Sequence, residues 1–460
     1  MDRSRRAFLA GLAATTALGL SGCAARFGHQ QSYATQAVHW QNMNTVFHWT
    51  DVALQAIRDQ GMAPPLATRA LSMSHVAGFL AVNGIQKRYH TPFTLGDGPP
   101  EADPDIAYGM AFCTALGEHF QQTFLGDRKA FLKRFPNRAH KQRSVDWGDL
   151  AGKYVVRLRT NDGAEPSKVN YALKRYLKRE DSLAWTPTLP HYDAGEGPYF
   201  NPSYDNPLVP GFGAVTPWAF KSLDAYRAPN FYDPRSPEFA EEFAQIKVIG
   251  AAHSPTRTHD QSQIALFWED GPWGISPPGH FALIAMQILQ HRRMDIYELS
   301  RSMALISMAM CNAGISTWDS KYHHDIIRPE TAIRHRAHKF HNPDPRVVAD
   351  PKWKSFIPTP PFPTYTSGHS AFGASGLRML ANIVGRDDIA FSARAPDTVI
   401  WPKTLSGVTR HWPSLWAAAE ENGLSRIYGG VHWNIDNDVA LRAGRDIADR
   451  MFAETLPVAA

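Results

Sequence analysis

Three short stretches near the C-terminal end of the chain contain residue types that together could carry chemistry. Lys321 is followed by Arg328-Pro329, the run Thr366-Ser367-Gly368-His369 comes next, and Ser425-Arg426 stands shortly before His432. Arginine presents a planar fork of donors, lysine is a compact charge, and a glycine amide approaches an oxygen without an intervening side chain. The set therefore suits a tetrahedral oxyanion. The two imidazoles add a nucleophile or metal ligand and a proton carrier near neutral pH.

Each stretch taken alone is open to an ordinary interpretation. Lys321 and Arg328 fit surface charges, the Ser-Gly-His run fits a loop or a helix start, and a lone His432 fits a structural histidine. Ser367 or Ser370 would serve as the N-cap of a helix that follows. Only the three stretches together, in this order and spacing, form a pattern specific enough to indicate a function.

This combination resembles the signature K-x6-RP, PSGH and SR-x5-H of one superfamily, which contains the vanadium-dependent haloperoxidases and the type 2 phosphatidic acid phosphatases. By this signature the chain is identified as a bacterial haloperoxidase-like member. Thr366 stands where the family has proline, a position that contributes no ligand there. The resemblance covers roughly the last two fifths of the chain, and it implies a helical-bundle fold of the vanadium haloperoxidase type.

The resemblance also implies a role for each matched residue. Bound vanadate, or phosphate in the same site, would be held by the cations, the hydroxyl and the glycine amide of Lys321, Arg328, Ser367, Gly368 and Arg426. His432 would coordinate vanadium, or attack phosphorus in a phosphatase. His369 would be the acid–base residue, and Lys321 would also polarise bound peroxide.

Flanking residues bear on which of the two chemistries is carried out. Trp318, three residues before Lys321, and Phe362, five before Ser367, match aromatic positions of the chloride-oxidising members, although both also fit ordinary core aromatics. Asp260, within the run RTHDQSQIALFW, matches an acid that hydrogen-bonds the catalytic histidine in those enzymes.

The sequence thus predicts a vanadium-dependent haloperoxidase that oxidises halide with hydrogen peroxide to hypohalous acid. The alternative within the superfamily is an acid phosphatase that acts through a phosphohistidine at His432. A non-catalytic anion-binding protein would leave every matched residue idle. The expected partners are hydrogen peroxide and a halide, with room for a small organic acceptor.

Composition sets the frame for these predictions. Hydrophobic residues make up 43% of the 460 residues and charged residues 20%, as in folded soluble proteins. The net charge of +5 comes without a basic run interleaved with aromatics, so no nucleic-acid partner is expected. Three cysteines exclude both a disulfide framework and a cysteine-rich zinc site.

Residues 1–23 have the pattern of a targeting segment. Arg5-Arg6 forms a twin-arginine pattern, and the apolar run Ala10 to Leu20 is too short for a membrane span. The ending Leu20-Ser21-Gly22-Cys23 resembles a bacterial lipoprotein box; cleavage nearby without a lipid is the alternative. We expect an exported protein, periplasmic or at the cell surface, whose contact with a membrane is a lipid on Cys23.

Hydrophobic spacing predicts an all-α fold of two helical bundles, with fewer than about a tenth of the residues in strands. The first bundle spans residues 40–235 and the second, which carries the site, spans 236–455. Proline, glycine and aromatic residues crowd together from Trp185 to Tyr232, which predicts a long ordered loop over the first bundle. Asp436 is interpreted as the cap of the last helix rather than as a catalytic group. We expect helices over residues 295–315 and 413–421, among others.

Overall fold

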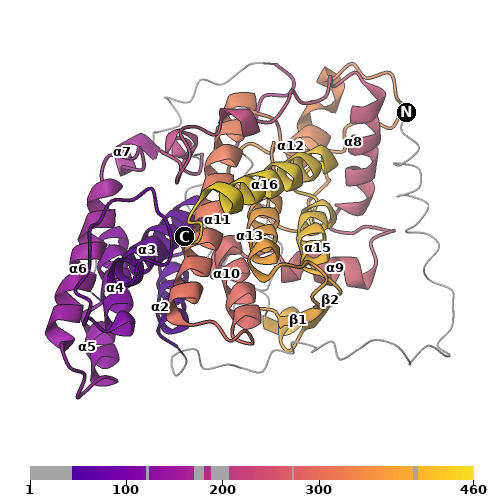
Figure 1. Ribbon diagram of the computed structural model, residues 1–460. Helices are drawn as coiled ribbons and strands as arrows, with labels where there is room; N and C mark the ends of the chain where they lie inside the picture. The colour runs from indigo at the N-terminus through magenta and orange to yellow at the C-terminus, as the bar shows by residue number, and fades with distance from the viewer. Residues whose placement is uncertain are drawn as a thin grey trace. The chain divides into compact units, whose positions relative to one another are not determined.

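The computed structural model describes residues 44–120, 124–169, 181–187, 207–271, 274–396 and 402–459, and most of these residues are helical (Figure 1). The helices are α2 (Thr45–Asp59), α3 (Pro64–Ile85), α4 (Pro104–Phe120), α5 (Leu125–Lys133), α6 (Lys141–Leu158), α7 (Pro166–Val169), α8 (Pro237–Ile249), α9 (His259–Phe267), α10 (Ser276–Leu289), α11 (Ile296–His324), α12 (Pro329–Thr331), α13 (Gly368–Val384), α14 (Pro402–Leu405), α15 (Leu415–Tyr428) and α16 (Asn434–Glu454). Shorter turns are the 3-10 turns η3 (Phe212–Ala214), η4 (Asp224–Tyr226) and η6 (Ala337–Lys339) and the π-helical turn η5 (Ala332–Arg336).

One antiparallel pair of strands, β1 (Phe391–Arg394) and β2 (Thr409–Trp412), is the single sheet in the described residues. Phe391 lies opposite Trp412 and Arg394 opposite Thr409. The predicted all-α fold is therefore confirmed.

The helices form two groups that share one core. Helices α3, α4 and α6 pack on one another and α2 packs on α4, whereas α13 packs against α10, α11, α15 and α16 (Figure 1). Helix α11 also packs on α3 and joins the groups. A single cluster of buried apolar side chains runs from Val46 to Leu456 through both groups. The division into residues 40–235 and 236–455 stays a prediction.

Helix α11 carries the first motif residue. Its N-cap Asp295 accepts from the amides of Tyr297 and Glu298, each at 3.0 Å, and the Glu298 carboxylate accepts from the Asp295 amide. The helix ends at Asp325, which has a φ of 51°. The expected end at residue 315 is wrong, because the helix continues to His324 and holds Lys321 in its last turn.

A stripe of polar side chains on α11 binds the segment 218–228 by its backbone. The stripe consists of Asn312, Ser316, Ser320 and His324, which contact Trp218, Tyr226 and Ala228. These positions repeat every four residues, so they lie along one side of the helix. The described part of the long loop, residues 207–232, is thus tied to the helix that carries Lys321; residues 188–206 lie outside the described residues.

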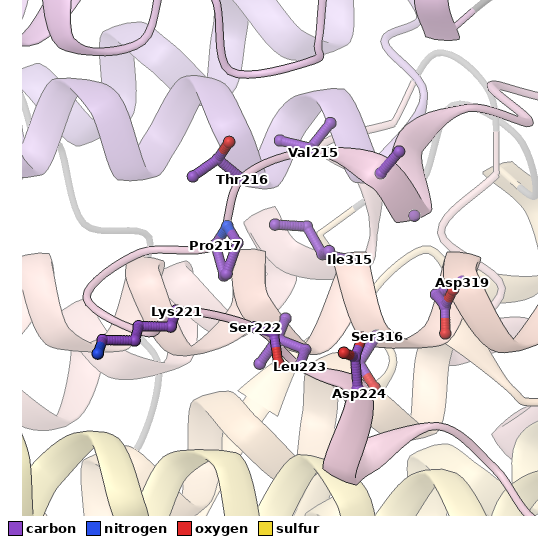
Figure 2. A pocket seen from close by; sticks show the side chains of 12 residues that line it. Val215, Thr216, Pro217, Lys221, Ser222, Leu223, Asp224, Ile315, Ser316 and Asp319 are labelled. Atoms are coloured by element: carbon purple, nitrogen blue, oxygen red, sulfur yellow. The ribbon is translucent and has the colours of Figure 1, made fainter.

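A pocket of about 250 Å³ opens between this segment and α11 (Figure 2). Ile315, Ser316 and Asp319 line it from the helix, and Thr216 and Asp224 are among its lining residues from the segment. None of the matched motif residues lines this pocket. At 100° per residue, Ile315 and Asp319 lie on a side of α11 turned away from Lys321.

The loop before His432 approaches the end of α8 closely. Gly430 has a φ of 76°, and a Cβ there would lie 2.2 Å from the Gly250 carbonyl oxygen. Gly407 also has a φ of 76°, but a Cβ there would meet nothing within 4 Å. Alanine at Gly407 therefore tests the cost of the left-handed backbone alone, whereas alanine at Gly430 adds the cost of steric overlap.

Gly407→Ala should cost about 1–2 kcal/mol for the left-handed backbone alone. Gly430→Ala should cost this amount and about 1–3 kcal/mol or more for the overlap with Gly250. Thermal unfolding of both variants beside the parent protein tests the prediction. A Gly430→Ala protein that is no less stable than Gly407→Ala would contradict it.

The expectations for the N-terminal segment and for Cys23 fall in residues 1–43, outside the described residues, and stay predictions. Among the described helices, none has the length and apolar character needed to cross a bilayer.

Candidate functional site

The fold brings residues of all three stretches into one buried cluster. Lys321 lies in the last turn of α11 and Arg328 caps α12. Ser367 caps α13, whose first two residues are Gly368 and His369. Arg426 lies in the last turn of α15, and His432 precedes α16. Lys321 and Arg328 are 0% exposed, Arg426 2% and His432 1%, so their charges and ring nitrogens are removed from bulk water.

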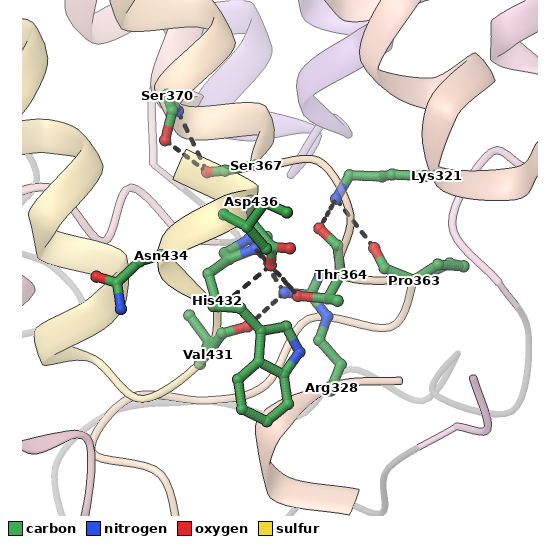
Figure 3. A network of polar contacts seen from close by, with 12 residues as sticks. Lys321, Arg328, Pro363, Thr364, Ser367, Ser370, Val431, His432, Asn434 and Asp436 are labelled. Carbon is green, nitrogen blue, oxygen red and sulfur yellow. Dashed lines mark hydrogen bonds and ion pairs between the residues drawn. The ribbon is translucent and has the colours of Figure 1, made fainter. Parts of the chain in front are cut away.

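Direct hydrogen bonds join the first stretch to residues 362–364, just before the second stretch (Figure 3). The Lys321 ammonium donates to the carbonyl oxygens of Pro363 and Thr364, both at 2.9 Å. The Arg328 guanidinium donates from Nε to the Phe362 carbonyl at 2.8 Å. An ammonium has three donors, so one remains for a ligand.

The same guanidinium contacts the third stretch and fixes the tautomer of His432. Arg328 Nη1 donates to the Val431 carbonyl at 2.7 Å and lies 3.1 Å from His432 Nε2. Because a guanidinium only donates, Nε2 must be the unprotonated nitrogen. The proton is then on Nδ1, which lies 2.7 Å from Asp436 Oδ2. A lone pair on Nε2 is what a metal ligand or a nucleophile requires.

Asp436 does more than the sequence indicated. The prediction that it caps α16 is confirmed, because its Oδ2 accepts from the Trp433 amide at 3.1 Å. The same oxygen holds His432 Nδ1 and accepts a hydrogen bond from the Thr364 hydroxyl. In addition, the Asp436 carbonyl accepts from the Ser367 amide at 3.0 Å. In the sequence, the position of Asp436 four residues after His432 was the only indication of this contact. The structure shows that the carboxylate reaches the imidazole ring.

His369 is held in the opposite tautomer. Its Nε2 lies 3.1 Å from the Glu269 carbonyl oxygen, which only accepts, so Nε2 carries the proton and Nδ1 is the basic nitrogen. Its own carbonyl accepts from Asn422 Nδ2 at 2.7 Å. Burial and the charge of Arg426 hold the pKa of His369 well below its ordinary value. His369 is therefore neutral near neutral pH and can accept a proton.

The interpretation of Asp260 as the acid that holds His369 does not agree with the structure. Asp260 lies in the first turn of α9, and its side chain is 66% exposed. It pairs with Arg410 of β2 at 2.9 Å. The carbonyl of Glu269 occupies the place beside His369 that was expected for a carboxylate.

Positive charge dominates the cluster. Burial, followed by the nearby Arg328 charge, holds the pKa of Lys321 well below its ordinary value. Burial lowers the pKa of Arg328, and burial together with the same cations lowers that of His432. Burial raises the pKa of Asp436 to about 6. Buried cations in excess of carboxylates are costly unless an anion compensates them.

The residues present fit an oxyanion such as vanadate or phosphate. Arg328 Nη2 is buried and has no hydrogen-bond partner among the described residues. Gly368 opens α13, so its amide has no acceptor within the helix. The Ser367 oxygen accepts from the Ser370 hydroxyl at 2.8 Å, which leaves the Ser367 proton available. Donors of these kinds are those that bind tetrahedral anions.

Trp318 and Phe362 lie beside these cations. Their ring centroids are 5.2 Å apart, and the Lys321 ammonium lies 5.7 Å from the first and 4.9 Å from the second. The Arg328 guanidinium lies 4.7 Å from the Phe362 ring. Trp318 is 1% exposed and its indole donates to the Leu208 carbonyl at 3.2 Å. An apolar, water-excluding wall therefore adjoins the cations.

This part of the chain is similar in sequence to known proteins. Residues 301–458 match the family model of the vanadium chloroperoxidase second helical-bundle domain. The vanadium chloroperoxidase of Curvularia inaequalis is 27% identical over 247 residues, which cover 43% of this chain and 39% of that protein. Residues 301–458 therefore resemble the second helical-bundle domain of the vanadium chloroperoxidases, and the match spans about two fifths of the curated relative.

Solved structures of bacterial vanadium-dependent haloperoxidases have the same fold as this chain. A bacterial vanadium-dependent iodoperoxidase superposes with a TM-score of 0.74 at 22% identity, covering 90% of this chain and 96% of its own. A holo-type bacterial vanadium-dependent chloroperoxidase gives a TM-score of 0.64 at 17% identity, covering 91% and 93%. The helical-bundle fold thus extends over most of the chain, beyond the segment that the sequence matches.

The contacts of Asp436 with His432 and Thr364 make it a specific target for substitution. Asp436→Asn should weaken binding of vanadate or phosphate by about 10- to 100-fold, as loss of a partner behind a metal ligand typically does. The reason is that an amide can turn its NH2 toward Nδ1 and shift the imidazole proton to Nε2. Isothermal titration with either anion measures the effect. Asp438→Asn, an exposed position on the same helix, is the control, and equal affinity of the two variants would contradict the prediction.

Proposed function

We propose that the protein is a vanadium-dependent haloperoxidase that oxidises halide with hydrogen peroxide to hypohalous acid. The observation that carries the proposal is the His432 Nε2 lone pair, which faces a buried set of cations while Asp436 holds the proton on Nδ1. His432 would be the ligand of vanadium, and Lys321, Arg328, Ser367, Gly368 and Arg426 would hold the oxygens. Bound vanadate would supply a Lewis-acidic centre at which peroxide becomes electrophilic.

The residues of this chain supply proton transfer and charge. His369 Nδ1 takes a proton from incoming hydrogen peroxide, because its other nitrogen is fixed on Glu269. Lys321 uses its remaining N–H to polarise a peroxide oxygen. Halide attacks that oxygen and the O–O bond breaks; the proton returned by His369 and one further proton from solvent complete hypohalous acid and water. Trp318 and Phe362 would keep water away from the reacting oxygen.

An acid phosphatase is the second candidate, and the same histidine geometry favours it. An unprotonated Nε2 backed by a carboxylate is also the arrangement of a nucleophile, which would form a phosphohistidine. His369 would then protonate the leaving group. The aromatic pair Trp318 and Phe362 beside Lys321 favours the peroxidase, since these residues match aromatic positions of the chloride-oxidising enzymes.

One comparison of two assays tests the proposal. The purified protein, freed of anions, is assayed for peroxide-dependent bromination of a β-diketone with and without added orthovanadate, and for hydrolysis of p-nitrophenyl phosphate. We expect bromination that depends on vanadate and phosphatase activity that vanadate inhibits. Phosphate-ester hydrolysis without any vanadate-dependent bromination would reverse the order of the two candidates. If neither activity occurs, both proposals are wrong.

A further inference from the structure

Helix α8 contacts the loop that carries His432 on both sides of the histidine. Its C-cap Gly250 lies against Gly430, two residues before His432. Eight residues earlier, Glu242 reaches Asn434 and Ile435, which follow the histidine. The helix itself is firmly set: Ser236 caps it, accepting from the Phe239 amide at 3.1 Å, and Pro237 is its first residue.

Glu242 binds the start of α16 with both carboxylate oxygens. Its Oε1 accepts from the Ile435 amide at 3.1 Å, and its Oε2 accepts from the Asn434 amide and from Asn434 Nδ2, the latter at 3.3 Å. Asn434 and Ile435 are the first two residues of α16, whose amides have no acceptor within the helix. Charge-assisted bonds at a helix N-terminus are strong and directional. In Figure 3 the Asn434 side chain points away from the cluster around His432.

Aromatic packing fixes the helix that presents this carboxylate. Phe239 and Phe243 lie against Trp433, with ring centroids 5.6 and 6.4 Å apart. Trp433 is fully buried and its indole donates to the Ile327 carbonyl at 3.1 Å. Glu242 is 8% exposed, so it is part of the interior and its position follows from the packing around it.

We propose that Glu242 is a positioning residue for His432, which fixes the first turn of α16 and thereby aims the Nε2 lone pair at the oxyanion. That turn directly follows the histidine and carries Asp436, whose carboxylate holds Nδ1. A shift of the turn therefore moves the imidazole and its partner together. This inference rests on the proposed function only in that an oxyanion binds at His432.

A simple capping role does not account for this residue. Asp436 already caps α16 through the Trp433 amide. Burial, with the nearby Asp436 charge as a lesser cause, raises the pKa of Glu242 to about 7, so its negative charge is disfavoured there. A buried second carboxylate is costly, whereas a neutral serine or asparagine serves as a helix cap without that cost. A carboxylate with two oxygens holds two successive amides, which orients the turn as well as ending it.

The test compares Glu242→Gln with Glu238→Gln, an exposed position in the first turn of the same helix. Glutamine has one accepting oxygen, so one of the two amides loses its acceptor. Orthovanadate and inorganic phosphate are titrated by calorimetry, and the His432 imidazole is observed by 15N NMR in anion-free protein. We expect Glu242→Gln to bind both anions about tenfold more weakly or worse. We also expect its Nδ1–H signal to be shifted or broadened, while Glu238→Gln matches the parent protein.

Unchanged affinity and an unchanged imidazole signal in Glu242→Gln would overturn the inference. If this variant does not fold, Glu242→Asp takes its place, since it keeps the charge but shortens its reach. A Glu242→Asp protein with parental affinity and imidazole signal would also overturn it. If the parent protein binds neither anion, the proposed function fails. The imidazole signals of the anion-free variants still decide whether Glu242 positions His432.

Discussion

His432→Ala should abolish vanadate-dependent bromination at ordinary vanadate concentrations. The substitution removes the nitrogen lone pair that faces Arg328, and leaves charge and hydrogen bonds alone to hold the anion. Vanadate affinity should therefore fall by more than the roughly 10- to 100-fold that loss of an outer partner costs. Calorimetric titration of vanadate, with bromination measured in the same samples, gives both numbers.

Loss of folding must be separated from loss of the ligand in this variant. The alanine leaves the buried Asp436 carboxylate without the imidazole, which costs about 1–3 kcal/mol for the unmet hydrogen bond. Added imidazole, which fills the space and restores the nitrogen, should recover part of the vanadate binding. His338→Ala, at an exposed histidine far along the chain, should change nothing. Bromination by His432→Ala at the parental rate would remove the vanadium mechanism altogether.

Hydrophobic spacing was sufficient for most helices because their ends carry local signals. Helix α8 shows such signals, since Ser236-Pro237 starts the helix and Gly250 follows it. Helix α15 was predicted to end at residue 421 but ends at Tyr428, and helix α11 was also predicted too short. Its continuation is rich in polar residues such as Ser316 and Ser320, which are buried because they bind the backbone of residues 226–228. That partner is distant in sequence, so no local pattern could show it.

The same limit applies to the site. The spacing of the three stretches identified the cations, the Ser367 hydroxyl and both histidines, because the type of each side chain follows directly from the sequence. The groups that orient them are largely backbone atoms, such as the Glu269 carbonyl at His369, and a backbone carbonyl has no sequence signature. Asp260 was assigned as the orienting acid because its run resembles a segment of the chloride-oxidising enzymes, and such a short run does not show which side of a helix faces the site. Glu242 lies 192 residues from Asn434 along the chain.

The two histidines should be separable by experiment, because the structure holds them in opposite tautomers. His369 offers Nδ1 and His432 offers Nε2, and only the second faces Arg328. Each ring therefore has a single nitrogen available for chemistry. A group that accepts a proton without holding the anion should affect turnover and leave binding intact.

His369→Ala should still bind vanadate, because His432 and all three cations are unchanged. Removing a neutral ring takes no charge from the anion's surroundings, so we expect affinity within a few-fold of the parent protein. Turnover should fall by roughly 100- to 10,000-fold, the usual contribution of a positioned acid–base group. The same vanadate titration and bromination assay measure both effects. If His369→Ala lost vanadate binding as completely as His432→Ala, His369 would have to hold the anion as well, and the separation of ligand and base would be wrong.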